Sequence, residues 1–161
     1  MGTSRPLHVL LVHVWYWPHV GGGDQHVEQI GRELVRRGHR VTVWCADVPT
    51  HEERRFNRGG VDVVRIRPSM LLGGVDPLVS VSDLDLSDVD VVHLHDTLPV
   101  LIRRTLSKAK KAGKPVVTTY HNDYVKKTAL GRAVKRIRWV LQGRRTIHSS
   151  DAGIVLTPFF E

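Results

Sequence analysis

Three short apolar runs of the sequence each lead into residues that can bind or transform a polar ligand. The runs are residues 8–14, 89–95 and 115–120, and imidazole, carboxylate, amide and glycine groups stand at or just after their ends. An imidazole can hydrogen-bond a ligand hydroxyl or carry a proton near neutral pH. The residues are His19, Gly21, Gly22 and Gly23 after the first run, His95 and Asp96 at the end of the second, and His121, Asn122 and Asp123 after the third.

The glycine run Gly21–Gly23 precedes a helical pattern and is a candidate phosphate site. Glycine lets a ligand approach the backbone closely, and the free N–H groups and the dipole at a helix start favour an anion. A flexible turn is the alternative interpretation. The chain has neither the G-x-G-x-x-G pattern of dinucleotide sites nor the G-x-x-x-x-G-K-[ST] pattern of P-loops. We therefore expect neither an NAD enzyme nor a P-loop nucleotidase.

The histidines allow two kinds of chemistry. His93 and His95 face the same side of a strand, but a third metal ligand would have to be His121 from the next strand. Histidines on a strand are more often hydrogen-bonded than metal-bound, so we expect no metal. We expect His121, at the tip of its strand, to be the catalytic residue, and a structural histidine is the alternative. The chain contains no G-x-S-x-G, which argues against a serine hydrolase.

The spacing of apolar residues indicates the elements that must hold these groups. Valine-rich runs predict buried strands, and apolar residues three and four apart predict helices. Strands that alternate with helices are typical of a parallel sheet covered on both faces. We predict an α/β fold: a Rossmann-like, three-layer domain with a mainly parallel sheet of about six strands, whose carboxyl ends form one binding rim. The predicted strands are 8–14, 40–46, 61–67, 89–95, 115–120 and 152–157, the predicted helices are 24–37, 99–112 and 126–142, and the predicted loops are 47–60 and 68–88.

The net charge of the chain is concentrated in one segment. The 161 residues include 24 Lys and Arg against 16 Asp and Glu, a formal charge of +8. Eight of the bases lie within 126–145, which contains no acid, so the rest of the chain is balanced. We expect the aspartates within 76–96 to be answered by the bases within 103–114. A single cysteine, Cys45, excludes a disulfide-built secreted scaffold, and no apolar run reaches the ~20 residues of a membrane span, so we expect a cytoplasmic location.

The helix predicted over 126–142 has a basic face and an apolar face. The apolar face, which includes Ile137 and Leu141, is expected to pack on the sheet. A basic helix that carries Trp139 suits an anionic membrane surface or an anionic acceptor. Nucleic acid is not expected, because no aromatic-lined sheet face or helix-turn-helix pattern accompanies the charge. The bases assigned to this surface are Lys127, Arg132, Lys135, Arg136 and Arg138.

Five segments together resemble a known enzyme family. In chain order they are residues 8–14, the glycine loop and helix start at 21–27, the helix end and strand at 37–43, the segment 90–96 (DVVHLHD) and the segment 119–123 (TYHND). With these segments the chain resembles the N-terminal domain of retaining glycosyltransferases with the GT-B fold. This is the family 4-like group that includes phosphatidylinositol mannosyltransferase. The segments span nearly the whole chain in the family's order.

The resemblance implies transfer of a sugar from a nucleotide-sugar donor to a carbohydrate or lipid-linked acceptor, with no cofactor besides the donor substrate. It also implies that Gly21 and Gly22 approach the donor diphosphate, that His121 lies beside the transferred sugar, and that His95 and Asp96 line the cleft. We add Gly23 to the donor site, and His19, Asn122 and Asp123 to the cleft.

The resemblance further implies how the activity is organised. We expect residues 1–161 to form one domain, the acceptor-side half of the enzyme, and to be inactive without the carboxyl-terminal, donor-binding domain. Such an enzyme would work in the cytoplasm, with a peripheral position at the inner face of the cell membrane as an extension of this interpretation. A stand-alone, non-catalytic Rossmann-like binding module is the alternative.

Overall fold

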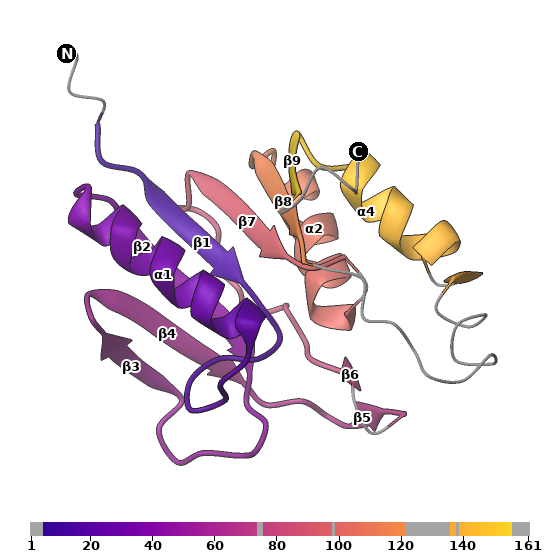
Figure 1. The fold of residues 1–161 in the computed structure, drawn as a ribbon, viewed down its shortest axis with the longest axis horizontal. Coiled ribbons are helices and arrows are strands. Elements are labelled where there is room, and N and C mark those ends of the chain that lie inside the picture. Colours follow the sequence, from indigo (N-terminus) through magenta and orange to yellow (C-terminus); the bar gives the residue numbers. More distant parts are fainter. Residues whose placement is uncertain (1–4, 74–75, 98, 122–135, 138, 156–161) are drawn as a thin grey trace.

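A computed structural model of the chain describes residues 5–73, 76–97, 99–121, 136–137 and 139–155 (Figure 1). Within these residues, seven strands form one sheet in the order β3-β4-β2-β1-β7-β8-β9, and two further strands form a short hairpin. The sheet contains β1 (His8–Val12), β2 (Arg40–Ala46), β3 (Arg55–Arg58), β4 (Val61–Ile66), β7 (Val91–His95), β8 (Val116–Tyr120) and β9 (Ala152–Val155), and the hairpin pairs β5 (Leu71–Leu72) with β6 (Asp76–Pro77).

The winding of the sheet reverses between β1 and β7. Every pair of neighbouring strands is parallel except β3 and β4, which are antiparallel. The chain passes from β1 to β2 and β4 on one side, and then crosses to β7 on the other side of β1. Ligands of such sheets bind outside the carboxyl ends of the strands at this point. The predicted Rossmann-like sheet is confirmed, with β3 as an added edge strand.

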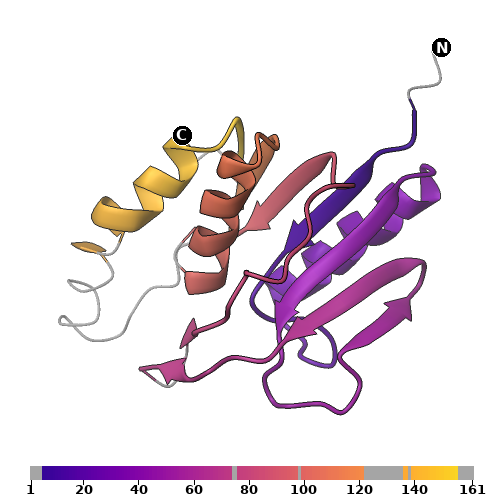
Figure 2. The ribbon, with the colours of Figure 1, turned by 180° about the vertical axis from the view of Figure 1, so that it is seen from behind.

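Helices cover both faces of the sheet, as Figures 1 and 2 show from opposite sides. Helix α1 (Gly22–Arg36) lies close against one face, because a Cβ at Gly31 would come within 3.2 Å of the Val61 side chain. Helix α2 (Val100–Lys111) covers the other face and buries Leu101 in the core there. Odd and even residues of β1 alternate between the two cores, as a strand buried on both faces requires.

Two predicted loops contain strands. Strand β3 lies within 47–60, and Gly59 and Gly60 join it to β4 with φ angles of +61° and +86°. Two adjacent residues with positive φ are typical of a tight hairpin turn, so this glycine pair was the signal for the missed strand. The hairpin of β5 and β6 lies within 68–88. The prediction that these segments are only loops is therefore wrong.

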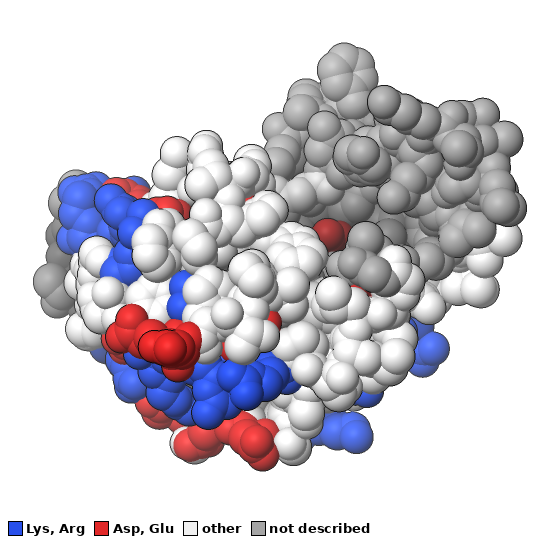
Figure 3. All heavy atoms as spheres, turned by 90° about the horizontal axis from the view of Figure 1, so that it is seen from below, with Lys and Arg blue, Asp and Glu red and all other residues white. Residues whose placement is uncertain are grey.

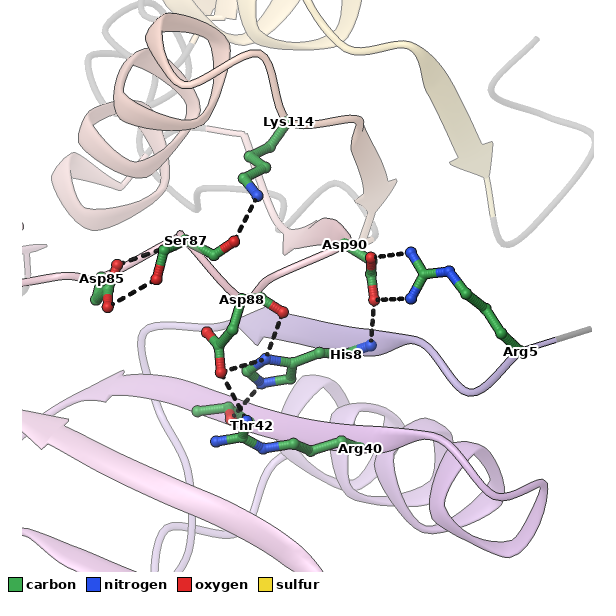
Figure 4. Close-up of polar contacts among 9 residues, drawn as sticks. All are labelled: Arg5, His8, Arg40, Thr42, Asp85, Ser87, Asp88, Asp90 and Lys114. Carbon is green, nitrogen blue, oxygen red and sulfur yellow. Dashed lines mark hydrogen bonds and ion pairs between the residues drawn. The ribbon is translucent and has the colours of Figure 1, made fainter.

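A polar network ties the chain together at the amino ends of the strands (Figure 4). The backbone N–H of His8 donates a hydrogen bond of 2.8 Å to Asp90, which also forms an ion pair with Arg5. Asp88 forms an ion pair of 2.6 Å with Arg40. These contacts fix the segment before β7 to the starts of β1 and β2.

The bases of the 103–114 segment answer the aspartates in a different way from the one expected. Among the described residues they form no ion pair with the aspartates of 76–96. Lys108 donates to the carbonyls of Val81 and Ser82, and Lys114 donates to the carbonyl of Ser87. These carbonyls belong to an irregular segment that lacks strand partners, so the lysines supply the missing hydrogen bonds.

Only the end of the predicted basic helix lies within the described residues. Residues 136–137 lead into a π-helical turn, η1 (Trp139–Gly143), and then into α4 (Arg144–His148), beyond the predicted end at 142. Ile137 and Leu141 are 58% and 65% exposed. The prediction that they pack on the sheet is wrong, because Gly143 and Thr146 face the body instead. The Thr146 hydroxyl donates to a carbonyl at the end of β7.

Among the described residues, no helix combines the length and the apolar character that crossing a bilayer requires.

Candidate active site

The carboxyl ends of β1, β7 and β8 bring a group of histidine rings together. The ring nitrogens His95 Nδ1 and His121 Nε2 lie 3.1 Å apart, within hydrogen-bonding distance. The ring centres of His26 and His121 are 5.0 Å apart, and those of His93 and His95 are 4.1 Å apart. The members are His13 directly after β1, His26 in α1, His93 and His95 in β7, and His121 directly after β8. We call these five residues the histidine cluster.

His13 connects the histidine cluster to the start of α1. Its Nδ1 lies 2.9 Å from the backbone carbonyl of His95, and its Nε2 lies 3.1 Å from the buried carboxylate of Asp24. The second oxygen of Asp24 is bound by His19. Burial alone would raise the pKa of Asp24, but the hydrogen bonds with His13 and His19 outweigh it and lower the pKa. The negative charge of Asp24 is therefore held by two imidazoles in the first turn of α1.

The glycine run lies against this group. Gly21 is the residue before the first turn of α1, and its carbonyl accepts a hydrogen bond from the Gln25 N–H. A Cβ at Gly23 would come within 2.9 Å of His13 Nε2, closer than real Cβ contacts, so the loop can lie here only with glycine at this position. A Cβ at Gly22 would meet nothing within 4 Å. The predicted phosphate loop and the histidine cluster thus form one site.

The rings of the cluster are held in the neutral form. Burial, supported by the neighbouring imidazoles, lowers the pKa of His121 to about 4. Burial likewise lowers the pKa of His93 to about 4, and it also lowers the pKa values of His26 and His95. A neutral imidazole donates one hydrogen bond and accepts another, so His121 can contact a ligand hydroxyl in either role at neutral pH.

The turn after β7 carries two signs of a functional site. Asp96 has a φ of +118°, and it is the one non-glycine residue with positive φ in the described part of the chain. Such a conformation is strained in residues with a Cβ and occurs often at binding sites. His95 Nε2 and Thr97 Oγ1 are buried without a hydrogen-bond partner among the described residues. Buried polar atoms normally have a partner, so this turn leaves capacity for one.

The structure brings part of the predicted site together. His95, His121 and Gly23 converge around His13, and Asp96 follows directly in the same turn. His19 binds the outer oxygen of Asp24 and stacks on Trp15, so it supports the glycine loop and remains half exposed. The predicted residues Asn122 and Asp123 lie outside the described residues.

The sequence prediction missed two members of the site. The pattern of apolar residues places His13 inside a buried strand, but β1 ends at Val12 and the ring turns toward the rim. The same pattern treats His26 only as part of the helix start. The signal for His13 was a polar residue inside an apolar run, whereas no local pattern places His26 next to His121.

Figure 3 shows the molecule from the side on which the parallel strands end. The middle of this face is mostly neither acidic nor basic, and Lys and Arg gather toward its margins. Arg136 is exposed, and it lines a pocket together with the apolar side chains of Ile137, Val140 and Leu141. Of the bases assigned to a membrane or anion surface, Arg136 is the one that the structure describes; Lys127, Arg132, Lys135 and Arg138 lie outside the described residues.

Comparison with protein families decides the family. The sequence model of Glycosyltransferase Family 4 matches residues 20–161, which include the glycine loop and all of the histidine cluster except His13. The chain belongs to Glycosyltransferase Family 4. The resemblance to the N-terminal domain of GT-B-fold enzymes of this family is thereby confirmed.

Two relatives of this family member share one name and come from a plant and from human. Each is a subunit of phosphatidylinositol N-acetylglucosaminyltransferase. The Arabidopsis thaliana protein is 29% identical over 132 residues, which cover 77% of this chain and 29% of the plant protein. The Homo sapiens protein is 21% identical over 126 residues, which cover 74% of this chain and 26% of the human protein. The chain therefore spans less than a third of the length of these curated relatives.

A solved structure shares the fold of this Glycosyltransferase Family 4 chain. Sucrose-phosphate synthase from Thermosynechococcus elongatus superimposes with a TM-score of 0.66 at 12% identity, over 94% of this chain and 43% of that protein. At this low identity the similarity concerns the fold alone, and it agrees with the three-layer arrangement described above.

Proposed function

We propose that this chain is the acceptor-side domain of a glycosyltransferase that moves a sugar from a nucleotide-sugar donor to an acceptor. The observation that carries the proposal is the packing of the glycine loop against His13, beside His121, at the reversal point of a Glycosyltransferase Family 4 sheet. In the transfer, the bond from the anomeric carbon to the donor phosphate breaks and a bond to an acceptor oxygen forms. Retention of the anomeric configuration belongs to the proposal and rests on the family resemblance.

The glycine loop is suited to the donor diphosphate. The free N–H groups at the start of α1 and the helix dipole favour an anion, and the position of Gly22 leaves open space for one. The neutral state of the neighbouring imidazoles lets them act as hydrogen-bond donors without adding charge. We assign the nucleotide itself to a second domain, and we expect the present chain to be inactive without it.

His121 is suited to hold the transferred sugar. Its Nε2 is engaged with His95, so Nδ1 is the ring nitrogen that can meet a sugar hydroxyl. The hydrogen bond to His95 and the contact with the ring of His26 restrain the orientation of the imidazole. Asp96, Asn122 and Asp123 remain our candidates for contacts with the acceptor, and His19 for support of the glycine loop.

The acceptor is proposed to be lipid-linked and anionic. Both curated relatives are named for transfer to phosphatidylinositol. Ile137, Val140 and Leu141 are exposed beside Arg136, and apolar side chains next to bases suit the surface of an anionic membrane. This places the enzyme at the cytoplasmic face of a membrane as a peripheral protein. Sedimentation with phosphatidylinositol vesicles should fall when Ile137 and Leu141 are both changed to Ser, and phosphatidylcholine vesicles serve as the control.

The decisive experiment uses the complete enzyme that contains this domain. Transfer from a panel of radiolabelled nucleotide sugars to lipid extracts is measured for the parent and for His121→Ala. We expect kcat/KM to fall by about 10²-fold or more with the preferred donor. Donor hydrolysis and transfer both absent from the complete protein, with donor binding retained, would favour a non-catalytic binding module. An unchanged kcat/KM in His121→Ala would remove His121 from the assigned role.

A further inference from the structure

Three histidines of the cluster form an arrangement that sugar transfer does not require. His26 comes from α1, His95 from β7 and His121 from the turn after β8. One ring nitrogen from each lies within 4.8 Å of the other two. The sequence pattern of His93, His95 and His121 argues against a metal site, because it lacks a suitable third ligand. The structure supplies that ligand from a helix, because α1 brings His26 to the rim.

The spacing of the closest pair fits a tetrahedral metal ion. Two nitrogens bound to zinc at 2.0–2.1 Å with a tetrahedral angle stand about 3.3–3.4 Å apart. His95 Nδ1 and His121 Nε2 are 3.1 Å apart, so an ion could replace the proton between them with little movement of either ring. His26 is half-buried on the helix surface and must close the remaining distance by a small side-chain rotation.

The surroundings of the three rings also favour a metal over a purely structural hydrogen bond. Burial favours the neutral imidazole, which is the form that binds a metal. The ring of His95 is fully buried, yet its Nε2 has no hydrogen-bond partner among the described residues. A structural histidine at such a position normally has both nitrogens satisfied. His13 contacts the backbone carbonyl of His95 and is itself held by Asp24, which fixes the strand end that carries this ring.

We propose that His26, His95 and His121 bind a divalent transition-metal ion of the zinc class. Three imidazoles leave a fourth coordination position for water or for another oxygen ligand, such as phosphate. Because His121 would belong to both sites, a bound ion and a sugar hydroxyl compete for the same ring. Zinc is therefore an inhibitor of sugar binding at this position.

The test is a zinc titration of the present chain, prepared without a polyhistidine tag and treated with a chelator. Isothermal titration calorimetry should show one zinc ion bound per chain. His26→Ala and His121→Ala should each weaken binding by at least about tenfold, since each removes a ligand. His148→Ala is the matched control, because it removes an exposed histidine of α4 and should leave the affinity unchanged. The visible spectrum of the Co²⁺ form should show tetrahedral coordination.

Three results would overturn the proposal: no saturable zinc binding, an affinity within twofold of the parent in either ligand variant, or a loss in His148→Ala equal to theirs. Circular dichroism of each variant confirms that it is folded before its affinity is compared. The titration contains neither donor nor acceptor, so its outcome does not depend on the proposed sugar transfer. An inactive complete enzyme with intact zinc binding would contradict the proposed function and leave this site in place.

Discussion

At the amino ends of the strands, both ring nitrogens of His8 have protein partners, whereas at the carboxyl ends His95 Nε2 has none among the described residues. His8 binds the Asp88 carbonyl at 3.1 Å and the Thr42 hydroxyl at 2.9 Å. Both rings are buried, so solvent exposure does not explain the difference.

The charges near the two ends differ in the same direction. Around His8, each acid has a base: Asp90 has Arg5 and Asp88 has Arg40, as Figure 4 shows. Around His121, neutral imidazoles lie against one another, and the one carboxylate described there, that of Asp24, is shared by two imidazoles. The amino end is thus a completed network that holds the fold, and the carboxyl end keeps hydrogen-bonding capacity for a ligand, as expected for the reversal point of this sheet.

The largest expected effect on stability is at the amino end. His8→Ala leaves the Asp88 carbonyl and the Thr42 hydroxyl without their partner, and should lower the free energy of unfolding by about 2–3 kcal/mol. Urea unfolding of the present chain, followed by circular dichroism, measures it. His121→Ala, at the carboxyl end, should cost less than about 1 kcal/mol, because its ring is half-buried and has one protein hydrogen bond. Equal costs for the two variants would contradict the comparison.

A smaller effect should separate two neighbouring glycines at the carboxyl end. Gly23→Ala places a Cβ within 2.9 Å of His13 Nε2 and must displace that ring. We expect a loss of about 1–2 kcal/mol in the free energy of unfolding, together with weaker donor binding by the complete enzyme. Gly22→Ala is the matched control, since its Cβ meets nothing within 4 Å, and it should change stability by less than about 0.5 kcal/mol. If both variants behave alike, the loop does not depend on contact with His13.

The smallest expected effect concerns acid stability at the amino end. Hydrogen bonds from Arg5 and from the His8 backbone N–H lower the pKa of Asp90 below its usual value of about 3.9. A carboxyl group with a lowered pKa stabilises the fold fully above its unfolded pKa, and this contribution is lost as the pH falls through the folded pKa. Between pH 5 and pH 2, roughly the range over which such a group titrates, the urea midpoint of Asp90→Asn should therefore fall less than that of the parent.

Arg5→Met provides the companion measurement for this pH dependence. It removes the first of the two causes that lower the pKa of Asp90 and keeps the carboxyl group. Its pH profile should lie between those of the parent and Asp90→Asn. A profile identical to the parent's would show that the ion pair with Arg5 contributes nothing in solution.

Much of the fold was predictable because local spacing determines it. The strand predicted over 40–46 has those bounds in the structure, since a valine-rich run between turn residues favours a buried strand. Gly38 and Gly113 follow the ends of α1 and α2 with φ angles of +86° and +65°, as glycine after a helix predicts. Strand β3 was missed because its residues are partly exposed and carry no apolar run, as edge strands often do.

The site was predictable in its parts and not in its connections. Gly21–Gly23, His95 and His121 were identified because they stand at the ends of predicted elements. His26 could not be placed beside His121, since they are separated by most of the chain and only the packing of α1 on the sheet brings them together. The outward direction of Ile137 and Leu141 was also not predictable, because helical spacing gives two opposed faces and does not say which one is buried.

The sequence by itself determined the element order, the parallel α/β sheet and the family, because these depend on periodicity, turn residues and short segments that are each local. Only the tertiary structure decided which histidine meets which. Contacts across β1, β7, β8 and α1 depend on register and helix packing, and these set the partners of Asp24, the neighbour of His121 and the unpaired nitrogen of His95. The chemistry of the rim is therefore a property of the packed sheet, and the same residues in an extended chain would not have it.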